Sequence, residues 1–170
     1  LSALDRLKAT GSFDEIRLTV RPGFTSAINR RSIEVVEKPW GQQADIDRDL
    51  AEADVLYLPL PFDAEYDSFV RYSLSTKLVT YLGTGLPILY HGPGHSAASR
   101  LLSDHQAAAW ASSQDLQDIM SAIHCIRKNR SEMVRRALCL ARSQFLLEDQ
   151  QQRFWSTVAS NPDQRVAFPA

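Results

Sequence analysis

The most constraining part of the sequence is segment 72–94, which reads YSLSTKLVTYLGTGLPILYHGPG. Its first half carries the signals of a helix. Ser73 and Ser75 are residue types that cap helices, and the apolar residues Leu78, Tyr81 and Leu82 then recur on one helical face. This pattern predicts a helix over 72–82, with Ser73 or Ser75 bonded to a backbone N–H group at its start.

The second half of the segment predicts a tight turn and a strand. Gly83 and Gly85 tolerate the left-handed turn that closes many helices, and Pro87 precedes the apolar run 88–90. The loop 91–94 then opens at the carboxyl end of this strand, where open α/β sheets place their ligands. The order of loop, helix, turn and strand is therefore typical of a parallel α/β sheet.

The rest of the chain alternates between strand and helix patterns. Strands are predicted at 13–20, 32–37, 54–60, 87–90 and 107–111, with a turn at 21–23. Helices are predicted at 1–10, 45–53, 96–103, 114–128, 131–145 and 148–159. The unbroken apolar run 54–60 is typical of a central strand buried on both faces. We therefore expect the α/β class, as a Rossmann-like doubly wound, mainly parallel sheet with helices on both faces.

Length and charge indicate one domain without a nucleic-acid partner. The 170 residues, 44% of them hydrophobic, suffice for one core at 1–159, and segment 160–170 is predicted to be a flexible C-terminal tail. The 19 basic and 20 acidic residues nearly cancel, which gives no electrostatic reason to expect nucleic acid. No apolar run approaches the roughly 20 residues of a membrane helix, and no signal peptide is recognised.

Cys125 and Cys139 are too few and too far apart for a disulfide framework or a zinc site, and both occupy apolar-looking helical positions. His91 and His95 flank Gly-Pro-Gly, which prevents the helix that would align them on a metal, so we expect no metal site. These observations favour a reducing compartment, and we expect the cytoplasm.

The start of the 72–82 helix is a candidate anion site. A helix amino end offers free backbone N–H groups and a positive dipole end, and Ser75, Thr76 and Lys77 add two hydroxyls and a cation. The alternative is that Ser73 or Ser75 is only a cap and Lys77 a solvated lysine. Spacing alone does not separate these two interpretations.

Two further loops are expected to border this site. Segment 61–71 follows the predicted central strand, so Glu65, Asp67 or Arg71 would lie over the ligand, or be an ordinary solvated loop. Arg71 would pair with a phosphate or with Asp67. His91 would face the ligand or be satisfied by backbone carbonyl groups.

The run STKLVTYLGTGLPILYHGP resembles the segment P-[ST]-K-x-x-E-Y-L-x-x-G-x-P-[VI] of retaining glycosyltransferases with the GT-B fold, of the group 1 or family 4 type. The matching residues are Thr76, Lys77, Tyr81, Leu82, Gly85, Pro87 and Ile88. Thr80 stands where the family has a carboxylate for the donor ribose, and Tyr72 replaces its partner carboxylate. The resemblance covers about 2–154, although only this segment is specific.

The resemblance implies the C-terminal, nucleotide-sugar-binding half of such an enzyme, beginning after the first strand of that half. The donor would be a nucleoside diphosphate sugar, transferred without a cofactor or metal to a glycan or lipid-linked acceptor. The acceptor and most catalytic contacts would come from an N-terminal domain outside these residues. The implied donor-binding residues are Ser73, Ser75, Thr76, Lys77, Thr80, Glu65, Arg71 and His91. The alternative is a degenerate α/β binding or assembly module that no longer binds nucleotide.

The last helices are basic on one face and apolar on the other. A solvated cationic face is the default interpretation, and weak peripheral attraction to anionic lipid at the inner face of the membrane is the alternative. Phe154 and Trp155 are expected to cap either this core or the surface of the absent domain. The basic residues are Arg127, Lys128, Arg130, Arg135, Arg136 and Arg142.

Overall fold

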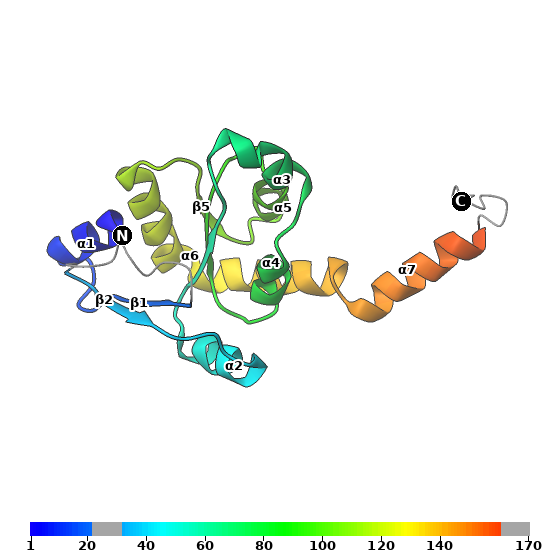
Figure 1. Cartoon of the computed structure of the whole chain (residues 1–170), viewed down its shortest axis with the longest axis horizontal. Helices are drawn as coiled ribbons and strands as arrows, with labels where there is room; N and C mark the ends of the chain where they lie inside the picture. The colour runs from blue at the N-terminus through cyan, green and yellow to red at the C-terminus, as the bar shows by residue number, and fades with distance from the viewer. Residues whose placement is uncertain (22–31, 161–170) are drawn as a thin grey trace.

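The computed structural model describes residues 1–21 and 32–160, with side chains described through 159. These residues form two small parallel sheets with helices around them (Figure 1). The smaller sheet pairs β1 (Arg17–Val20) with β2 (Glu34–Glu37). The larger sheet has the order β3 (Leu56–Pro59), β4 (Ile88–His91), β5 (Ala109–Ala111). The predicted α/β class and the parallel pairing are therefore confirmed.

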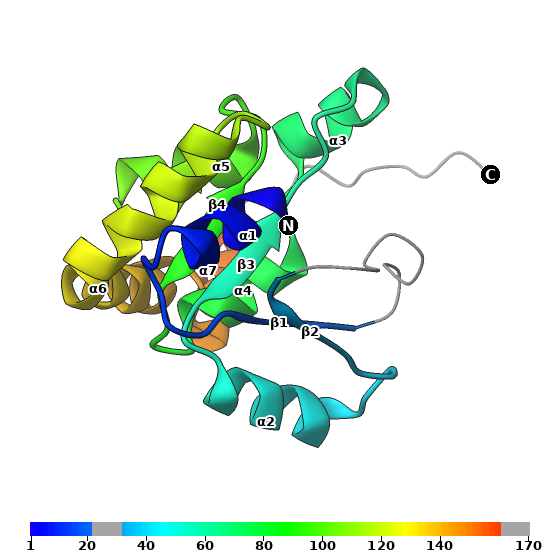
Figure 2. The same ribbon diagram turned by 90° about the vertical axis from the view of Figure 1, so that its left-hand side faces the viewer.

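The strands form two sheets, whereas the sequence predicts one. Among the described strands, β1 pairs only with β2 and β3 pairs only with β4, so β1 and β3 each keep one edge without a ladder partner. Figure 2 places β3 between β4 and the β1–β2 sheet. A continuous doubly wound sheet is thus not present within the described residues.

The predicted central strand is an edge strand of the larger sheet, and β4 is its centre. The prediction that it is buried on both faces is also wrong. Leu56 and Leu58 are buried, whereas Tyr57 between them is 41% exposed. Side chains alternate across a strand, and no described element fully covers the face to which Tyr57 belongs. An apolar run alone cannot reveal that one face lacks a cover.

Most helices lie close to their predicted positions, but the helix predicted at 72–82 begins at Thr76, because Tyr72 ends the preceding helix and 73–75 are not helical. Gly11 at φ +67° follows the first helix, and Gly85 at φ +75° lies in the turn before β4, so both use the left-handed backbone that glycine adopts without strain. The predicted turn at 21–23 lies outside the described residues beyond Arg21, and so does the predicted tail beyond 160. The predicted helices appear as α1 (Ser2–Ala9), α2 (Gln43–Glu52), α4 (Thr76–Leu82), α5 (Ala97–Asp104), α6 (Leu116–Gln144) and α7 (Leu147–Ser160).

Segment 61–71 is helical over much of its length, so its prediction as a loop is wrong. A short 3-10 helix η1 (Ala64–Tyr66) leads into α3 (Asp67–Tyr72). Arg71 donates to the Asp67 carboxylate one turn earlier, which is a favourable i,i+4 pair. The short helix therefore brings these two side chains together on one face.

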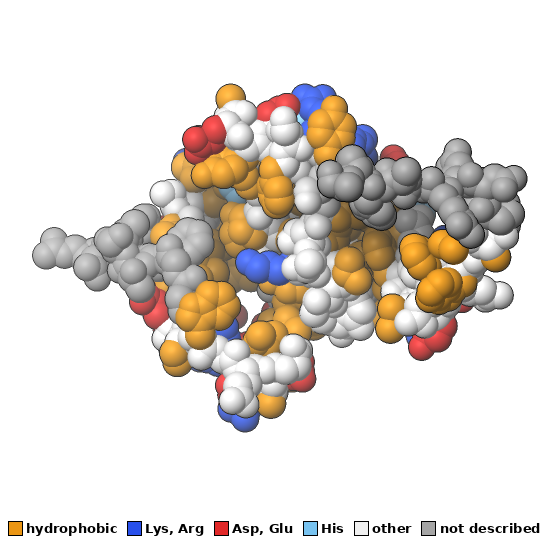
Figure 3. Space-filling view, turned by 45° about the vertical axis from the view of Figure 1, so that its right-hand side comes forward, with side chains coloured by type: hydrophobic (Ala, Val, Ile, Leu, Met, Phe, Trp, Pro, Cys, Tyr) orange, Lys and Arg blue, Asp and Glu red, His pale blue; other side chains and the backbone are white. Residues whose placement is uncertain are grey.

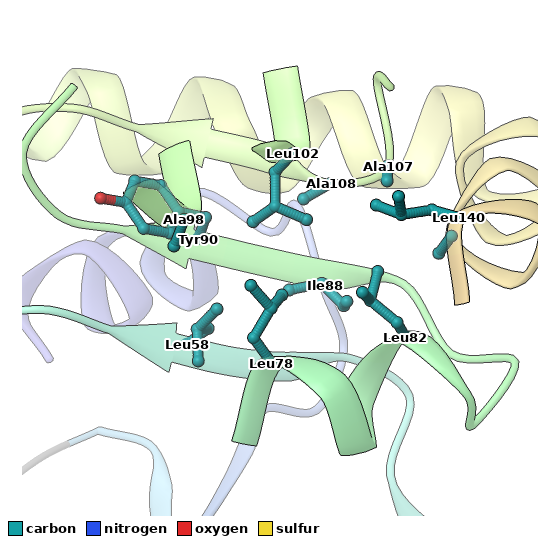
Figure 4. Close-up of a cluster of buried hydrophobic side chains, with 11 residues drawn as sticks. Leu58, Leu78, Leu82, Ile88, Tyr90, Ala98, Leu102, Ala107, Ala108 and Leu140 are labelled. Atoms are coloured by element: carbon teal, nitrogen blue, oxygen red, sulfur yellow. The ribbon is translucent and has the colours of Figure 1, made fainter. Parts of the chain in front are cut away.

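The main core lies between the larger sheet and α4, α5 and the second half of α6 (Figure 4). A second cluster on the opposite face joins Leu89 to alanines of β5, to the first half of α6 and to Met133 just after its midpoint. Because Leu89 and Tyr90 alternate across β4, their clusters mark the two faces. The main cluster consists of Leu58, Leu78, Leu82, Ile88, Tyr90, Ala98, Leu102, Ala107, Ala108, Ala137 and Leu140.

Helix α6 serves both faces because it bends. Asn129, at φ −120° and ψ 17°, is not helical, and Figure 1 shows the change of direction at this part of the chain. Before it, Ala122 and Ile126 pack on one face, and after it, Ala137 and Leu140 join the main core. The prediction of two helices, at 114–128 and 131–145, is therefore confirmed: they are the two halves of α6, separated by the kink at Asn129.

Helix α7 projects away from the body (Figure 1), and every described side chain in it is exposed. Phe154 and Trp155 pack edge to face on each other, with centroids 5.2 Å apart. Figure 3 shows hydrophobic side chains at the surface beside the C-terminal end of this helix. The prediction that these aromatics cap this core is therefore wrong within the described structure.

Candidate functional site

The candidate site lies where the strands of the larger sheet end. Figure 4 shows Leu78, early in α4, beside the Leu58 and Tyr90 ends of β3 and β4, and Leu82 beyond Ile88. Helix α4 therefore runs antiparallel to the strands, as the order helix, turn, strand requires. Its amino end lies at the carboxyl edge of the sheet, the edge where open α/β sheets bind ligands.

The start of α4 exposes the residues that the sequence predicts for an anion. Thr76 and Lys77 are exposed and form the first residues of the helix, after the half-buried Ser75. The predicted cap is absent, because in the described structure the Ser75 side chain accepts no hydrogen bond from the first turn. Ser73 belongs to the preceding helix instead, since its N–H donates to the carbonyl oxygen of Phe69.

His91 ends β4 and is held through both ring nitrogens. Its Nδ1 lies 2.8 Å from the Tyr57 hydroxyl, and its Nε2 lies 2.9 Å from the carbonyl oxygen of Ser113. Because a carbonyl oxygen only accepts, Nε2 donates to Ser113, while Nδ1 shares a hydrogen bond with the Tyr57 hydroxyl. Phe62 packs beside the ring, and burial raises the pKa of Tyr57. His91 therefore joins β3 to the loop after β5.

Asp67, Arg71 and His95 form a second polar group at this edge. Nε2 of His95 lies 2.8 Å from Oδ1 of Asp67, and Arg71 donates to both carboxylate oxygens over 3.2 to 3.3 Å. Partial desolvation opposes ionisation of Asp67, but the hydrogen bonds and charges of Arg71 and His95 hold its pKa below the ordinary value. The sequence predicts that Arg71 pairs with a phosphate or with Asp67, and the structure shows the ion pair with Asp67.

The remaining predicted donor contacts are not gathered with Lys77. Glu65 is exposed in η1, and Thr80 is exposed one turn along α4, with its hydroxyl 3.5 Å from the carbonyl oxygen of Thr76. Within the described residues, no hydrogen bond or ion pair joins Glu65, Thr80 or His91 to Lys77. Thr76 and Lys77 are therefore neighbours at the start of α4, and within the described residues no hydrogen bond or ion pair links Glu65 to them.

A cavity that the sequence does not reveal lies at the carboxyl ends of β1 and β2. Its volume is about 250 Å³. Asp49 accepts from Arg21 at 2.8 Å and from Lys38 at 2.6 Å, and these bonds, that of Lys38 first, lower its pKa. Arg21 and Lys38 are thereby both paired with Asp49, whereas Trp40 is 82% exposed. The lining residues are Arg21, Lys38, Pro39, Trp40, Asp45, Arg48 and Asp49.

Four of the six late basic residues are bound within the chain. Arg127 and Arg130 donate to backbone carbonyl groups outside α6, and Arg135 and Arg136 both donate to Glu132. Glu132 offsets part of the charge of Arg135 and Arg136, whereas Arg127 and Arg130 keep their full charge because a carbonyl group is neutral. The described helices include none that is long and apolar enough to cross a membrane.

The two thiols do not belong to the site. Cys125 and Cys139 are free and exposed on α6, so their apolar-looking positions do not reflect burial. In the described part of the chain, no group of three or more His, Cys, Asp and Glu side chains is arranged to hold a metal ion.

Comparisons of this chain with protein-family models, with curated proteins and with solved structures found no match. The site is therefore interpreted from its own residues and geometry.

Proposed function

We propose that residues 1–159 are the donor-binding domain of a retaining glycosyltransferase with the GT-B fold, and that the donor is a nucleoside diphosphate sugar. One observation carries this proposal. The amino end of α4, with Thr76 and Lys77 exposed, lies at the carboxyl edge of β3 and β4. That edge is where open α/β sheets bind ligands, and an uncapped helix start suits a phosphate.

The chemistry of this helix start favours an anion with several oxygens. The first backbone N–H groups of α4 are not satisfied by the Ser75 side chain, and the Thr76 hydroxyl and Lys77 ammonium add donors. With seven residues, α4 has a short dipole, so Lys77 is expected to supply most of the charge. A diphosphate matches this set, because it offers oxygens to both backbone and side chain.

We propose further that the two sheets belong to one doubly wound sheet. The free edges of β1 and β3 would then pair with one strand that is not among the described strands. Leu18 and Val20 of β1 are only half-buried and Tyr57 of β3 is exposed, which supports an uncovered space beside both strands. This strand corresponds to the first strand that the resemblance implies.

Sugar transfer itself is proposed to need an N-terminal domain that brings the acceptor, a glycan or a lipid-linked sugar. The described residues supply a place for the donor, and no base or nucleophile is assigned among them. We place the reaction in the cytoplasm, with peripheral contact at the inner face of the membrane when the acceptor is lipid-linked. Polysaccharide synthesis is the process that such a transfer serves.

A non-catalytic binding or assembly module is the second candidate, and one observation favours it. The ribose-binding acids of the resembling family are replaced by Thr80, whose hydroxyl contacts Thr76, and by the exposed Tyr72. A chain that had lost nucleotide binding would tolerate both replacements. The module interpretation predicts that no nucleotide stabilises the chain.

Titration calorimetry and thermal melting with UDP, GDP and ADP separate these candidates. Donor binding predicts that one of them stabilises the chain by about 2.7 kcal/mol at a hundredfold excess over its Kd. Lys77→Ala should weaken that binding at least about tenfold, since a hydrogen bond to a charged group contributes about 1.5 to 3 kcal/mol. Lys128→Ala, which removes an exposed lysine from α6, is the matched control and should bind as the unaltered chain does.

Two results would contradict the proposal. A melting temperature unchanged by all three nucleotides would favour the module. Equal losses of affinity in Lys77→Ala and Lys128→Ala would mean that the anion is held by general surface charge.

A further inference from the structure

The Asp67 carboxylate occupies the centre of a group of donors at the carboxyl edge of the larger sheet. Its Oδ2 accepts from Nε and a terminal nitrogen of Arg71, and its Oδ1 accepts from the same terminal nitrogen and from Nε2 of His95. A forked guanidinium that meets two oxygens is the geometry with which arginine binds carboxylates and phosphates. The two carboxylate oxygens therefore occupy the positions that two oxygens of a phosphate would occupy.

The two donors are fixed by a third residue. Arg100 of α5 donates to the backbone carbonyl oxygen of His95 at 2.5 Å and to that of Arg71 at 2.9 Å. It therefore ties the loop after β4 to the end of α3. Because Arg100 holds the backbone of both residues, their side chains stay near each other even when Asp67 turns away.

The site adjoins the proposed donor site in the chain. Arg71 precedes α4 by five residues, and His95 follows the end of β4 by four. Helix α3, which contains Arg71, and the loop that contains His95 follow the carboxyl ends of β3 and β4, the edge where open α/β sheets bind ligands.

We propose that Arg71 and His95 form a phosphate-binding site, and that Asp67 fills it in the absence of ligand. The identity of the ligand as a nucleoside diphosphate rests on the proposed function, whereas the preference for a phosphate over the carboxylate rests on the contacts of Asp67. Arg100 is a positioning residue of this site. Phosphate binding displaces the Asp67 side chain into water and takes over its hydrogen bonds.

A phosphate can displace the Asp67 side chain easily because the three side chains of this group are partly exposed. The side chains of Asp67 and Arg71 are each 41% exposed and that of His95 is 47% exposed, and exposed ion pairs contribute little to stability. Asp67 is the first residue of α3, so its side chain can turn toward solvent while the helix stays formed. A phosphate also brings more negative charge to Arg71 than the carboxylate it replaces.

The test compares pyrophosphate binding by the 170-residue chain and by Asp67→Asn in titration calorimetry at low ionic strength. Removing a unit charge a few ångströms from the phosphate should tighten binding about tenfold. Glu132→Gln is the matched control, because Glu132 is also an exposed carboxylate between two cations, Arg135 and Arg136 on α6. It should bind pyrophosphate as the unaltered chain does.

A second variant keeps the test decisive if Asp67→Asn loosens α3. Asp67→Ser places another helix-start residue there and should show the same gain, while thermal melting shows whether each variant is folded. Adding Arg71→Ala to Asp67→Asn should abolish the gain in pyrophosphate affinity. The proposal is overturned if folded Asp67→Asn and Asp67→Ser bind pyrophosphate no tighter than the unaltered chain, or if Arg71→Ala leaves the gain intact.

The proposed function has its own readout in the same experiment. If UDP binds the unaltered chain and Asp67→Asn gains nothing for pyrophosphate, donor binding stands and the Asp67 site falls. If none of UDP, GDP and ADP binds either protein while Asp67→Asn gains pyrophosphate affinity, the phosphate site stands and the donor assignment falls.

Discussion

The hydroxyl of Tyr57 on β3 lies 2.8 Å from Nδ1 of His91 on β4, and Nε2 of His91 in turn lies 2.9 Å from the carbonyl oxygen of Ser113. These two contacts link β3, β4 and the loop after β5, which are distant in the sequence. It gives His91 a structural role at the carboxyl edge of the sheet.

Tyr57→Phe should lower the free energy of unfolding by about 1 kcal/mol, because it removes the hydrogen bond between the Tyr57 hydroxyl and Nδ1 of His91. Tyr66→Phe is the control, since within the described residues the Tyr66 hydroxyl has no hydrogen-bond partner and the side chain is also exposed. Urea denaturation measures the free energy of unfolding of both variants. Equal effects of the two substitutions would show that the Tyr57 bond does not stabilise the fold.

Tyr90→Phe should lower the free energy of unfolding more than Tyr57→Phe does. The Tyr90 hydroxyl is fully buried, donates to the carbonyl oxygen of Pro93 at 2.8 Å and lies 2.7 Å from the Ser96 hydroxyl. Because the Tyr90 proton goes to Pro93, the Ser96 hydroxyl donates to Tyr90, and loss of the Tyr90 oxygen leaves that buried donor unpaired, at a cost of about 1 to 3 kcal/mol.

Ser96→Ala removes a partner of Tyr90 and also the cap of α5, since the Ser96 hydroxyl oxygen accepts from the N–H of Ser99. In a double-mutant cycle measured by denaturation, the combined loss from Tyr90→Phe and Ser96→Ala should be smaller than the sum. Strict additivity would mean that the two hydroxyls do not interact.

Leu78→Ala should destabilise the chain by about 2 to 5 kcal/mol, because Leu78 is fully buried between α4 and the sheet. Val79→Ala, on the exposed side of the same helix, should stay within about 0.5 kcal/mol. Thermal melting of both variants checks the orientation of α4. A larger loss for Val79→Ala would mean that α4 presents the opposite face to the sheet.

The ion pairs of Glu132 should contribute to stability only above acidic pH. The hydrogen bond from Arg135, with a second from Arg136, lowers the pKa of Glu132 from 4.5 to about 2. Because the folded value is the lower one, the contribution is present above pH 4.5 and is lost as the pH falls toward about 2. It should be small, since the groups are exposed.

The melting temperatures of the unaltered chain and Glu132→Gln should therefore differ slightly near neutral pH and converge as the solution is acidified. The same measurement on Asp149→Asn, an acidic residue of α7, serves as a control for general charge effects. A difference between the unaltered chain and Glu132→Gln that stays constant with pH would contradict the role of these ion pairs.

The sequence predicts the order of helix, turn and strand in segment 72–94 because those signals are local, although the helix begins at Thr76 and lacks the predicted cap. The stripe through Leu78 and Leu82, the left-handed Gly85 and the apolar run of β4 each depend on neighbouring residues only. The helix in 61–71 is missed because its polar residues resemble a loop. The i,i+4 spacing of Asp67 and Arg71 is the signal that could have identified it.

Properties that depend on distant partners could not be predicted. Whether Tyr57 is covered depends on what packs against the second face of β3, and periodicity contains no such information. The bond from Tyr57 to His91, the pairing of Asp67 with His95 and the cavity beside Trp40 all join separate segments. The sequence thus identifies candidate residues, and the fold determines which of them meet.

Hydrogen–deuterium exchange without nucleotide and with saturating UDP, GDP and ADP in turn tests most directly whether a sugar donor binds at the start of α4. The proposed site predicts slower exchange of the backbone N–H groups at 73–78, with little change in α7. Exchange that is unchanged throughout the chain, or slowed only around the cavity at 38–49, would contradict it.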